Sequence, residues 1–282
     1  MLIAQISDLH IGFDVDNPNE RNLQRLNAVL DILIPMAPAC LLVTGDLTEF
    51  GSLESYRRLH AALARCPFPI FAGVGNHDRR DEFAQVFTAT GRDADHVHYT
   101  ADLPGLRLVM LDTLDPGHHG GAFCESRAGW LRARLAEAPD TPTLLILHHP
   151  PIPTGIAWMT AFPQDPWVMR LESIVRANPQ IRRVVAGHIH RALLRDWAGT
   201  TVAVCPSTSP QVALDFRAMA DHPDGRPMIV DEPPAFAIHQ WDGSGFTTHF
   251  GVASGQRALA RYDLRMKPVV EHIMAEHPAP NA

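Results

Sequence analysis

The sequence has no apolar run that approaches the ~20 residues that a membrane-spanning helix needs. Its first six residues include no basic side chain, and Asp8 interrupts the apolar stretch before it reaches the length of a secretory leader. We therefore expect a cytoplasmic protein that neither crosses nor binds a membrane.

Cysteine and lysine are both scarce. The four cysteines are scattered without C-x-x-C spacing, which argues against a disulfide framework and predicts reduced, mostly buried side chains. Lys267 is the only lysine, the net charge is −7, and no dense run of basic residues occurs. Long nucleic acids and anionic membranes are therefore poor candidate partners. With 282 residues, 46% of them hydrophobic, the chain can form one large domain with an appendage.

The tetrapeptide Gly75-Asn76-His77-Asp78 is the most informative stretch that the chain does contain. It follows an apolar run, 69–74, that is typical of a short buried strand. The amide, imidazole and carboxylate groups would then lie at the C-terminal end of that strand, the edge at which open α/β sheets bind their ligands. A polar turn is the alternative for these four residues alone, and the remainder of the chain argues against it.

Apolar runs and helical periodicities alternate along the first part of the chain. Strands are predicted at 2–7, 40–44 and 70–74, and helices at 23–34 and from about residue 52. The polar residues that follow these strands are, in order, Asp8 with His10, Asp46, and Asn76. Because residues two apart on a strand point to the same side, Asp8 and His10 can converge on one ion.

The second part of the chain repeats this pattern. Further strands are predicted at 106–111, 143–147 and 181–186. The second of them leads into His148-His149-Pro150-Pro151 and the third into Gly187-His188-Ile189-His190. Three later segments, 200–204, 235–241 and 246–252, are predicted to be strands of a second sheet.

Seven candidate metal ligands thus lie at or just beyond strand ends: Asp8, His10, Asp46, Asn76, His148, His188 and His190. Nitrogen and oxygen donors without thiolate suit Fe, Mn, Zn or Co. Seven ligands suffice for two ions if one carboxylate bridges them, and Asp46 is the natural bridge because it is the lone ligand of its strand. Two ions about 3.5–4 Å apart would steady the attacking and leaving oxygens of a phosphoryl hydrolysis.

The ordered series Asp8-x-His10, Gly45-Asp46, Gly75-Asn76-His77-Asp78, His148 and Gly187-His188-x-His190 resembles the calcineurin-like metallophosphoesterase superfamily. The resemblance spans residues 8–190. It implies an α/β fold, a four-layer αββα sandwich of two mixed sheets flanked by helices, with a small C-terminal extension. Residues 1–205 would form the core, and residues 206–282 would supply second-sheet strands and a C-terminal cap or oligomerisation extension of the same domain.

The resemblance also implies roles for individual residues. One metal would be held by Asp8, His10, Asp46 and His190, and the other by Asp46, Asn76, His148 and His188. His148 is chosen over His149 because the family ligand lies in His-x-Pro. His77 would face the phosphate and stabilise the transition state or protonate the leaving oxygen, with Asp78 orienting it.

The stretch Gly45 to Gly51 and the His-His-Pro-Pro run look like those of class III cyclic nucleotide phosphodiesterases and bacterial glycerophosphodiesterases. Protein phosphatases of the superfamily continue the Gly-Asp block with Asp-Arg-Gly, which this chain lacks. The resemblance therefore implies a homo-oligomeric, dinuclear metal-dependent phosphodiesterase that hydrolyses cyclic nucleotides or glycerophosphodiesters through a metal-bridging hydroxide. A phosphomonoesterase or nuclease of the same superfamily, and a non-catalytic protein-binding scaffold, are the alternatives.

The remaining conspicuous residues are weaker candidates. His118, His119, His149 and Trp158 are each expected to be structural rather than catalytic. The segment 152–166 is expected to be a loop over the site, and Cys205 to Gln211 lie where relatives place pocket-wall residues.

Overall fold

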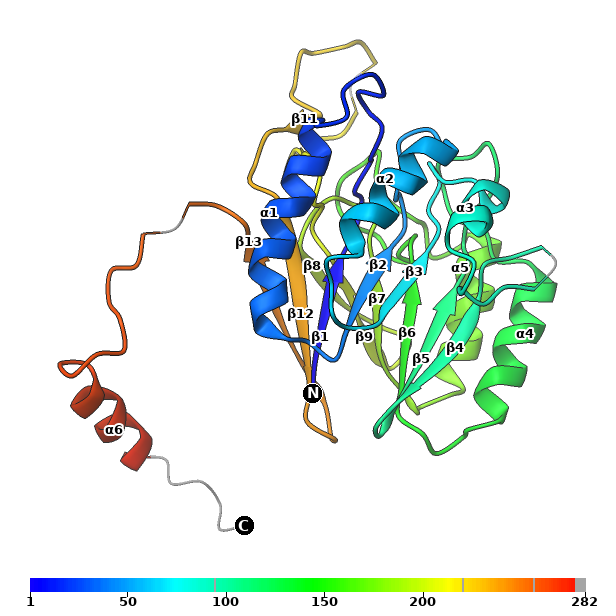
Figure 1. Cartoon of the computed structure of the whole chain (residues 1–282). Helices are drawn as coiled ribbons and strands as arrows, with labels where there is room; N and C mark the ends of the chain where they lie inside the picture. Colours follow the sequence, from blue (N-terminus) through cyan, green and yellow to red (C-terminus); the bar gives the residue numbers. More distant parts are fainter. Residues whose placement is uncertain (94, 220, 256, 277–282) are drawn as a thin grey trace.

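The computed structural model describes residues 1–93, 95–219, 221–255 and 257–276 (Figure 1). Its first sheet has the strand order β13-β12-β1-β2-β3. These strands are β1 (Leu2–Ile6), β2 (Cys40–Thr44), β3 (Ile70–Gly73), β12 (Ala235–Trp241) and β13 (Phe246–Val252). The second sheet has the order β4-β5-β6-β7-β9-β8. Its strands are β4 (Tyr99–Leu103), β5 (Leu106–Leu111), β6 (Thr143–Leu147), β7 (Ile181–Ala186), β8 (Leu193–Trp197) and β9 (Thr200–Val204).

All the described helices but the last cover the outer faces of the two sheets, and a short antiparallel pair of strands completes the described elements. The helices are α1 (Arg21–Met36), α2 (Leu53–Leu63), α3 (Arg80–Val86), α4 (Glu125–Ala136), α5 (Pro166–Arg176) and α6 (Lys267–Glu276). That pair consists of β10 (Gln211–Val212) and β11 (Ile229–Val230).

Three apolar clusters define four layers. Helices α1, α2 and α3 pack on the outer face of the first sheet, and α4 and α5 pack on the outer face of the second. A third cluster, which includes Ile3, Leu42 and Ile146, lies between the two sheets. The predicted αββα sandwich of two mixed sheets is therefore confirmed.

The central strands could be predicted from the sequence because they are buried on both faces. Every residue of β2 and β6 is buried, and both strands are continuous apolar runs apart from their end residues, as expected of parallel strands covered on two sides. Strands β1, β2 and β3 run parallel, as do β5, β6 and β7. Their carboxyl ends therefore meet at one edge of each sheet, where the candidate ligands follow.

The predicted placement of the three late strands in one second sheet is wrong. Strand β9 does belong to the second sheet, between β7 and β8. Strand β12, however, pairs antiparallel with β1, with Ala4 opposite Ile238, and β13 pairs with β12. The C-terminal strands therefore cover an edge of the N-terminal sheet that would otherwise be open.

Residues 257–276 lie away from the body of the protein, and no residue of α6 is buried (Figure 1). The end of the predicted extension, 277–282, lies outside the described residues. None of the described helices combines the length and the hydropathy needed to span a bilayer. The domain division at residue 205 and the oligomerisation role of the extension stay predictions.

Candidate metal centre

Five candidate ligands have a left-handed backbone conformation. Asp8, His10, Asp46, His188 and His190 have φ values of 54°, 48°, 47°, 71° and 54°, respectively. Among the other described non-glycine residues, only Ala37 and Ala198 have positive φ. Such conformations cost about 1–3 kcal/mol each and concentrate at functional sites. The chain therefore turns sharply after β1, β2 and β7 and presents these side chains at one edge of the sheets.

Glycines in the motifs permit the ligand loops to approach one another. A Cβ atom on Gly75 would lie 2.3 Å from Asp46 Oδ1 and 2.8 Å from His148 Cε1. A Cβ atom on Gly187 would lie 1.8 Å from Ser7 Oγ. Since real Cβ atoms do not approach other atoms so closely, any side chain at either position would push the loops apart.

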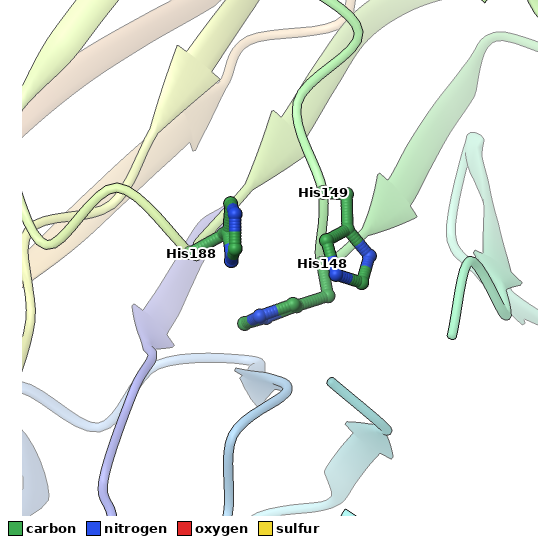
Figure 2. Close-up of side chains that lie close together, drawn as sticks. All are labelled: His148, His149 and His188. Atoms are coloured by element: carbon green, nitrogen blue, oxygen red, sulfur yellow. The ribbon is translucent and has the colours of Figure 1, made fainter. Parts of the chain in front are cut away.

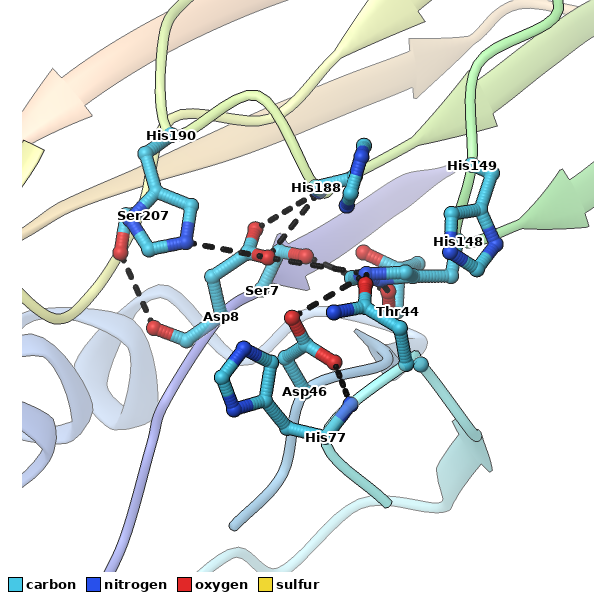
Figure 3. A network of polar contacts seen from close by, with 12 residues as sticks. Ser7, Asp8, Thr44, Asp46, His77, His148, His149, His188, His190 and Ser207 are labelled. Carbon is cyan, nitrogen blue, oxygen red and sulfur yellow. Dashed lines mark hydrogen bonds and ion pairs between the residues drawn. The ribbon is translucent and has the colours of Figure 1, made fainter. Parts of the chain in front are cut away.

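The first cluster of candidate ligands comprises Asp8, His10, Asp46 and His190. Figure 3 shows Asp8, Asp46 and His190 converging. His190 Nε2 lies 3.5 Å from Asp8 Oδ1, and His10 Nε2 lies 3.8 Å from Asp46 Oδ2. The two Nε2 atoms are 3.2 Å apart. The sequence-predicted ligands of one metal are therefore brought together.

Hydrogen bonds on the far side of each ring orient the two imidazoles of this cluster. His10 Nδ1 contacts Glu49 Oε2 at 2.7 Å, and His190 Nδ1 contacts the Pro210 carbonyl at 2.9 Å. Both partners accept hydrogen bonds, so each Nδ1 carries a proton and each Nε2 faces the other ring. Although burial lowers it, the pKa of His10 lies above its usual value because of Glu49, Asp46 and Asp8.

The second cluster surrounds His148. Its Nδ1 donates to the Thr44 carbonyl at 2.8 Å, and its Nε2 lies 3.2 Å from Asn76 Oδ1 and 3.3 Å from Asp46 Oδ2. Burial lowers the pKa of His148, but Asp46 outweighs it and raises the pKa to about 9. Burial would raise the pKa of Asp46, but His148 and His10 hold it well below its usual range. A buried carboxylate and imidazole thus again converge on a position for a cation.

His188 completes this cluster from the end of β7. Its ring centroid lies 5.1 Å from that of His148, and its backbone N–H donates to both carboxylate oxygens of Asp8 at 3.0 Å (Figure 3). Burial lowers the pKa of His188 and of His190, which keeps both imidazoles neutral, the form that binds metals. Oxygen and neutral nitrogen donors, oriented by second hydrogen bonds, fit a metal centre.

The contacts of Asp78 differ from expectation. The Asp78 carboxylate does not orient the His77 ring; it accepts backbone N–H groups of Leu47 and Gly75 at 3.1 and 2.9 Å and the Tyr56 hydroxyl at 2.9 Å. Burial, with Asp46 nearby, raises the pKa of Asp78 to about 6. His77 Nδ1 instead donates to the Glu49 carbonyl at 3.0 Å, and its backbone N–H donates to Asp46 Oδ1 at 2.9 Å. Asp78 therefore shapes the loops, and Glu49 orients His77.

Two site residues were missed from sequence. Glu49 holds His10 with its carboxylate and His77 with its carbonyl, and its place in the Gly45 to Gly51 block was the available signal. His119 was expected to be structural, but its Nδ1 lies 3.4 Å from Asn76 Nδ2 and its ring centroid 4.6 Å from that of His188. Its neighbour His118 is exposed, as expected for this loop.

The other weaker candidates lie beside the candidate ligands or in the apolar core. His149 is buried beside His148 and His188, with its Nδ1 2.9 Å from Thr113 Oγ1 (Figure 2). Trp158 packs against the apolar cluster outside the second sheet. In the segment Cys205 to Gln211, Ser207 Oγ donates to the Asp8 carbonyl at 2.9 Å. This segment therefore supports the ligand loops directly.

Comparison with known proteins agrees with this geometry. The family model described as calcineurin-like phosphoesterase matches residues 1–192. Glycerophosphodiester phosphodiesterase GpdQ of Enterobacter lignolyticus is 29% identical over 279 residues, which cover 93% of this chain and 92% of that protein. A probable cyclic nucleotide phosphodiesterase of Synechococcus is 33% identical over 230 residues, which cover 79% of this chain and 88% of that protein.

A dimetal phosphatase from Danio rerio has a related structure, with a TM-score of 0.62 over 90% of this chain and 99% of that chain. At 15% identity this likeness concerns the fold alone. The family match spans well over half of the sequence and confirms the resemblance inferred from the motifs. The chain belongs to the calcineurin-like phosphoesterase family.

Proposed function

We propose that the protein is a dinuclear metal-dependent phosphodiesterase that hydrolyses small phosphodiesters. The position of Asp46 carries the proposal: its Oδ2 lies 3.8 Å from His10 Nε2 in one cluster and 3.3 Å from His148 Nε2 in the other. One carboxylate thus borders both clusters, as a bridging ligand must.

The proposed ligand sets follow from these clusters. Asp8, His10, Asp46 and His190 would hold one ion, and Asp46, Asn76, His148 and His188 would hold the other. The absence of thiolate favours Fe, Mn, Zn or Co. When bound, a pair of such ions supplies Lewis-acid stabilisation of phosphoryl oxygens and lowers the pKa of water.

The residues of the chain would position the diester and handle protons. His77 is partly exposed beside His10, with ring centroids 4.6 Å apart. Because its Nδ1 is held by the Glu49 carbonyl, its Nε2 is the nitrogen available to a phosphoryl or leaving-group oxygen. Such a group can bind the phosphate or protonate the departing alkoxide.

The names of the relatives support a diester rather than a monoester substrate. One is called a glycerophosphodiester phosphodiesterase and another a probable cyclic nucleotide phosphodiesterase. The two names therefore favour a small diester as the substrate. The cytoplasmic location and the homo-oligomer expected from the sequence stay predictions.

The test is an assay of purified, metal-stripped protein on bis(p-nitrophenyl) phosphate before and after addition of Mn. We expect metal-dependent turnover, and faster turnover than with p-nitrophenyl phosphate. Absence of turnover would reject the proposal, and preference for the monoester would support a phosphomonoesterase. Fewer than one bound metal per chain by elemental analysis, even after supplementation, would support the non-catalytic scaffold.

A further inference from the structure

Two separate cavities meet at the metal centre. Cavity A, of about 740 Å³, is lined by His10 and His190 and extends between Phe13 and Ile229. Cavity B, of about 920 Å³, is lined by Asn76 and His119 and extends along α3. His77 and Glu49 line both cavities. Each volume lies within the range of pockets that bury small molecules, about 300–1,000 Å³.

Cavity A presents apolar surfaces and amides. Phe13 and Ile229 line it with 70% and 52% of their surfaces exposed, although both side chains are apolar. Asn17 and Asn19 also line it; Asn17 Oδ1 accepts the Asn19 backbone N–H at 3.0 Å, which leaves the Asn17 amide N–H₂ group available. An exposed aromatic ring with adjacent amides suits a planar group that has a hydrogen-bonding edge.

The charged groups of cavity A are largely engaged within the protein. The buried Glu20 carboxylate accepts the backbone N–H groups of Gly12 and Asp14 at 2.6 and 3.2 Å. The Arg21 guanidinium pairs with Asp231. Asp14 lies on the exposed rim. An uncharged group therefore suits this cavity better than an ionic one.

Cavity B has a different character. Its lining includes basic and acidic side chains, among them Arg79, Arg92 and Glu82. Arg79 is exposed, and its Nη1 atom lies as far as 4.0 Å from Glu82 Oε1. Both groups can therefore contact a ligand. Such a lining suits a polar group that carries charge.

The difference between the two cavities indicates a narrower substrate class, an inference that rests on the proposed function. We propose that the substrate is an acyclic phosphodiester with two different alcohol groups. An uncharged planar group, either an aryl ring or a nucleobase, occupies cavity A, and a polar charged group occupies cavity B. The phosphate lies at the metal centre between them. A cyclic nucleotide joins both ester oxygens to one sugar and leaves one of the two cavities empty.

The occupant of cavity A is tested with the full-length, metal-loaded protein and its Phe13→Ala variant. The substrates are p-nitrophenyl phosphocholine, which has a planar group, and glycerophosphocholine, which has none. The ratio of kcat/KM between variant and wild type is taken for each substrate, which cancels the unequal leaving-group reactivities. We expect a loss of about fivefold or more for the aryl substrate, from lost stacking, and a change below twofold for glycerophosphocholine.

Phe162→Ala is the matched control, because Phe162 is an exposed phenylalanine outside the linings of both cavities. It should leave both ratios near one. Equal losses for the two substrates with Phe13→Ala, or equal effects of Phe13→Ala and Phe162→Ala, would overturn the assignment of cavity A.

The occupant of cavity B is tested with Glu82→Arg, which reverses one charge of its lining. We expect about a fivefold loss of kcat/KM for p-nitrophenyl phosphocholine, since the new cation repels the choline group. Cyclic AMP has no second alcohol group, so its kcat/KM should change less than twofold. Glu54→Arg, an exposed charge reversal on α2 outside both linings, is the control. Equal losses for both substrates would overturn the acyclic assignment.

Turnover of bis(p-nitrophenyl) phosphate distinguishes a failure of the proposed function from a failure of the two-cavity assignment. If metal-dependent turnover is absent from the wild type, the proposed function fails. If turnover is present and the substrate-dependent effects of Phe13→Ala and Glu82→Arg are absent, the two-cavity assignment alone fails.

Discussion

Asp46 Oδ2 lies 3.3 Å from His148 Nε2, although Asp46 follows a strand of the first sheet and His148 a strand of the second. The two sheets otherwise meet through the apolar cluster between them and a few buried polar contacts, such as that of Gln5 Nε2 with the Ala186 carbonyl. A cation held by Asp46 and His148 would therefore join the two sheets at their functional edge.

Metal removal should consequently lower thermal stability. A ligand that binds only the folded state stabilises it by about 2.7 kcal/mol at a hundred times its Kd, which corresponds to about 5–10 °C in Tm for a chain of this size. We expect a strong chelator to lower Tm by that amount and added Mn to restore it. An unchanged Tm in thermal denaturation monitored by fluorescence would contradict this role.

Glu49→Gln should weaken metal binding. The carboxylate contact at 2.7 Å to His10 Nδ1 keeps the opposite nitrogen directed at the metal position. Loss of such a partner typically reduces metal affinity 10–100-fold, and we expect a reduction of about tenfold by metal titration. Glu54→Gln removes an exposed carboxylate on α2 and should leave the affinity unchanged. Similar affinities for the two variants would show that Glu49 does not position His10.

His119→Ala should impair the Asn76 ligand. His119 Nδ1 lies 3.4 Å from Asn76 Nδ2, and its Nε2 lies 3.4 Å from Met159 Sδ, so the ring holds the amide with its oxygen toward His148. We expect about a tenfold lower kcat, with reduced occupancy of one metal position. His118→Ala, an exposed neighbour in the same loop, is the control. Indistinguishable kcat and metal content for the two variants would remove His119 from the site.

His239 should make the metal-free protein sensitive to acid. It is fully buried between Gln5 Oε1 and Thr248 Oγ1, and burial, with a smaller effect of Arg183, lowers its pKa to about 3. Because the unfolded chain has the higher pKa, near 6.5, the contribution to stability is complete above pH 6.5 and is lost as the pH falls toward 3.

Below pH 6.5 that loss amounts to about 1.4 kcal/mol per pH unit. His239→Gln should therefore lose less unfolding free energy than the wild type between pH 6.5 and 4, as measured by urea denaturation of metal-free protein. Parallel pH dependences for the two proteins would show that the folded protein does not keep His239 neutral.

The candidate ligands could be predicted because each follows a strand whose apolar run is unmistakable. Asp46 and His148, for example, come directly after strands in which every residue is buried. The two edge strands of the second sheet, β4 and β8, were not predicted. Strand β8 is half exposed and mixes Leu193 with Arg195 and Asp196, so it shows neither a continuous apolar run nor a regular alternation.

The contacts that hold the candidate ligands in place could not be predicted from a sequence pattern either. The family resemblance implied that Asp78 orients His77, but the turn directs the Asp78 carboxylate toward Tyr56 instead. The contact of Glu49 with His10 joins residues far apart in the chain, and the position of His119 depends on packing against Met159. Such contacts are set by loop geometry, which local residue types do not specify.

Anomalous scattering from crystals of the protein soaked with Mn tests the central claim most directly. The account predicts two peaks per chain about 3.5–4 Å apart, one on each side of the Asp46 carboxylate, with His10 and His190 beside one peak and His148 and His188 beside the other. A single peak, or two peaks that do not share Asp46, would contradict it.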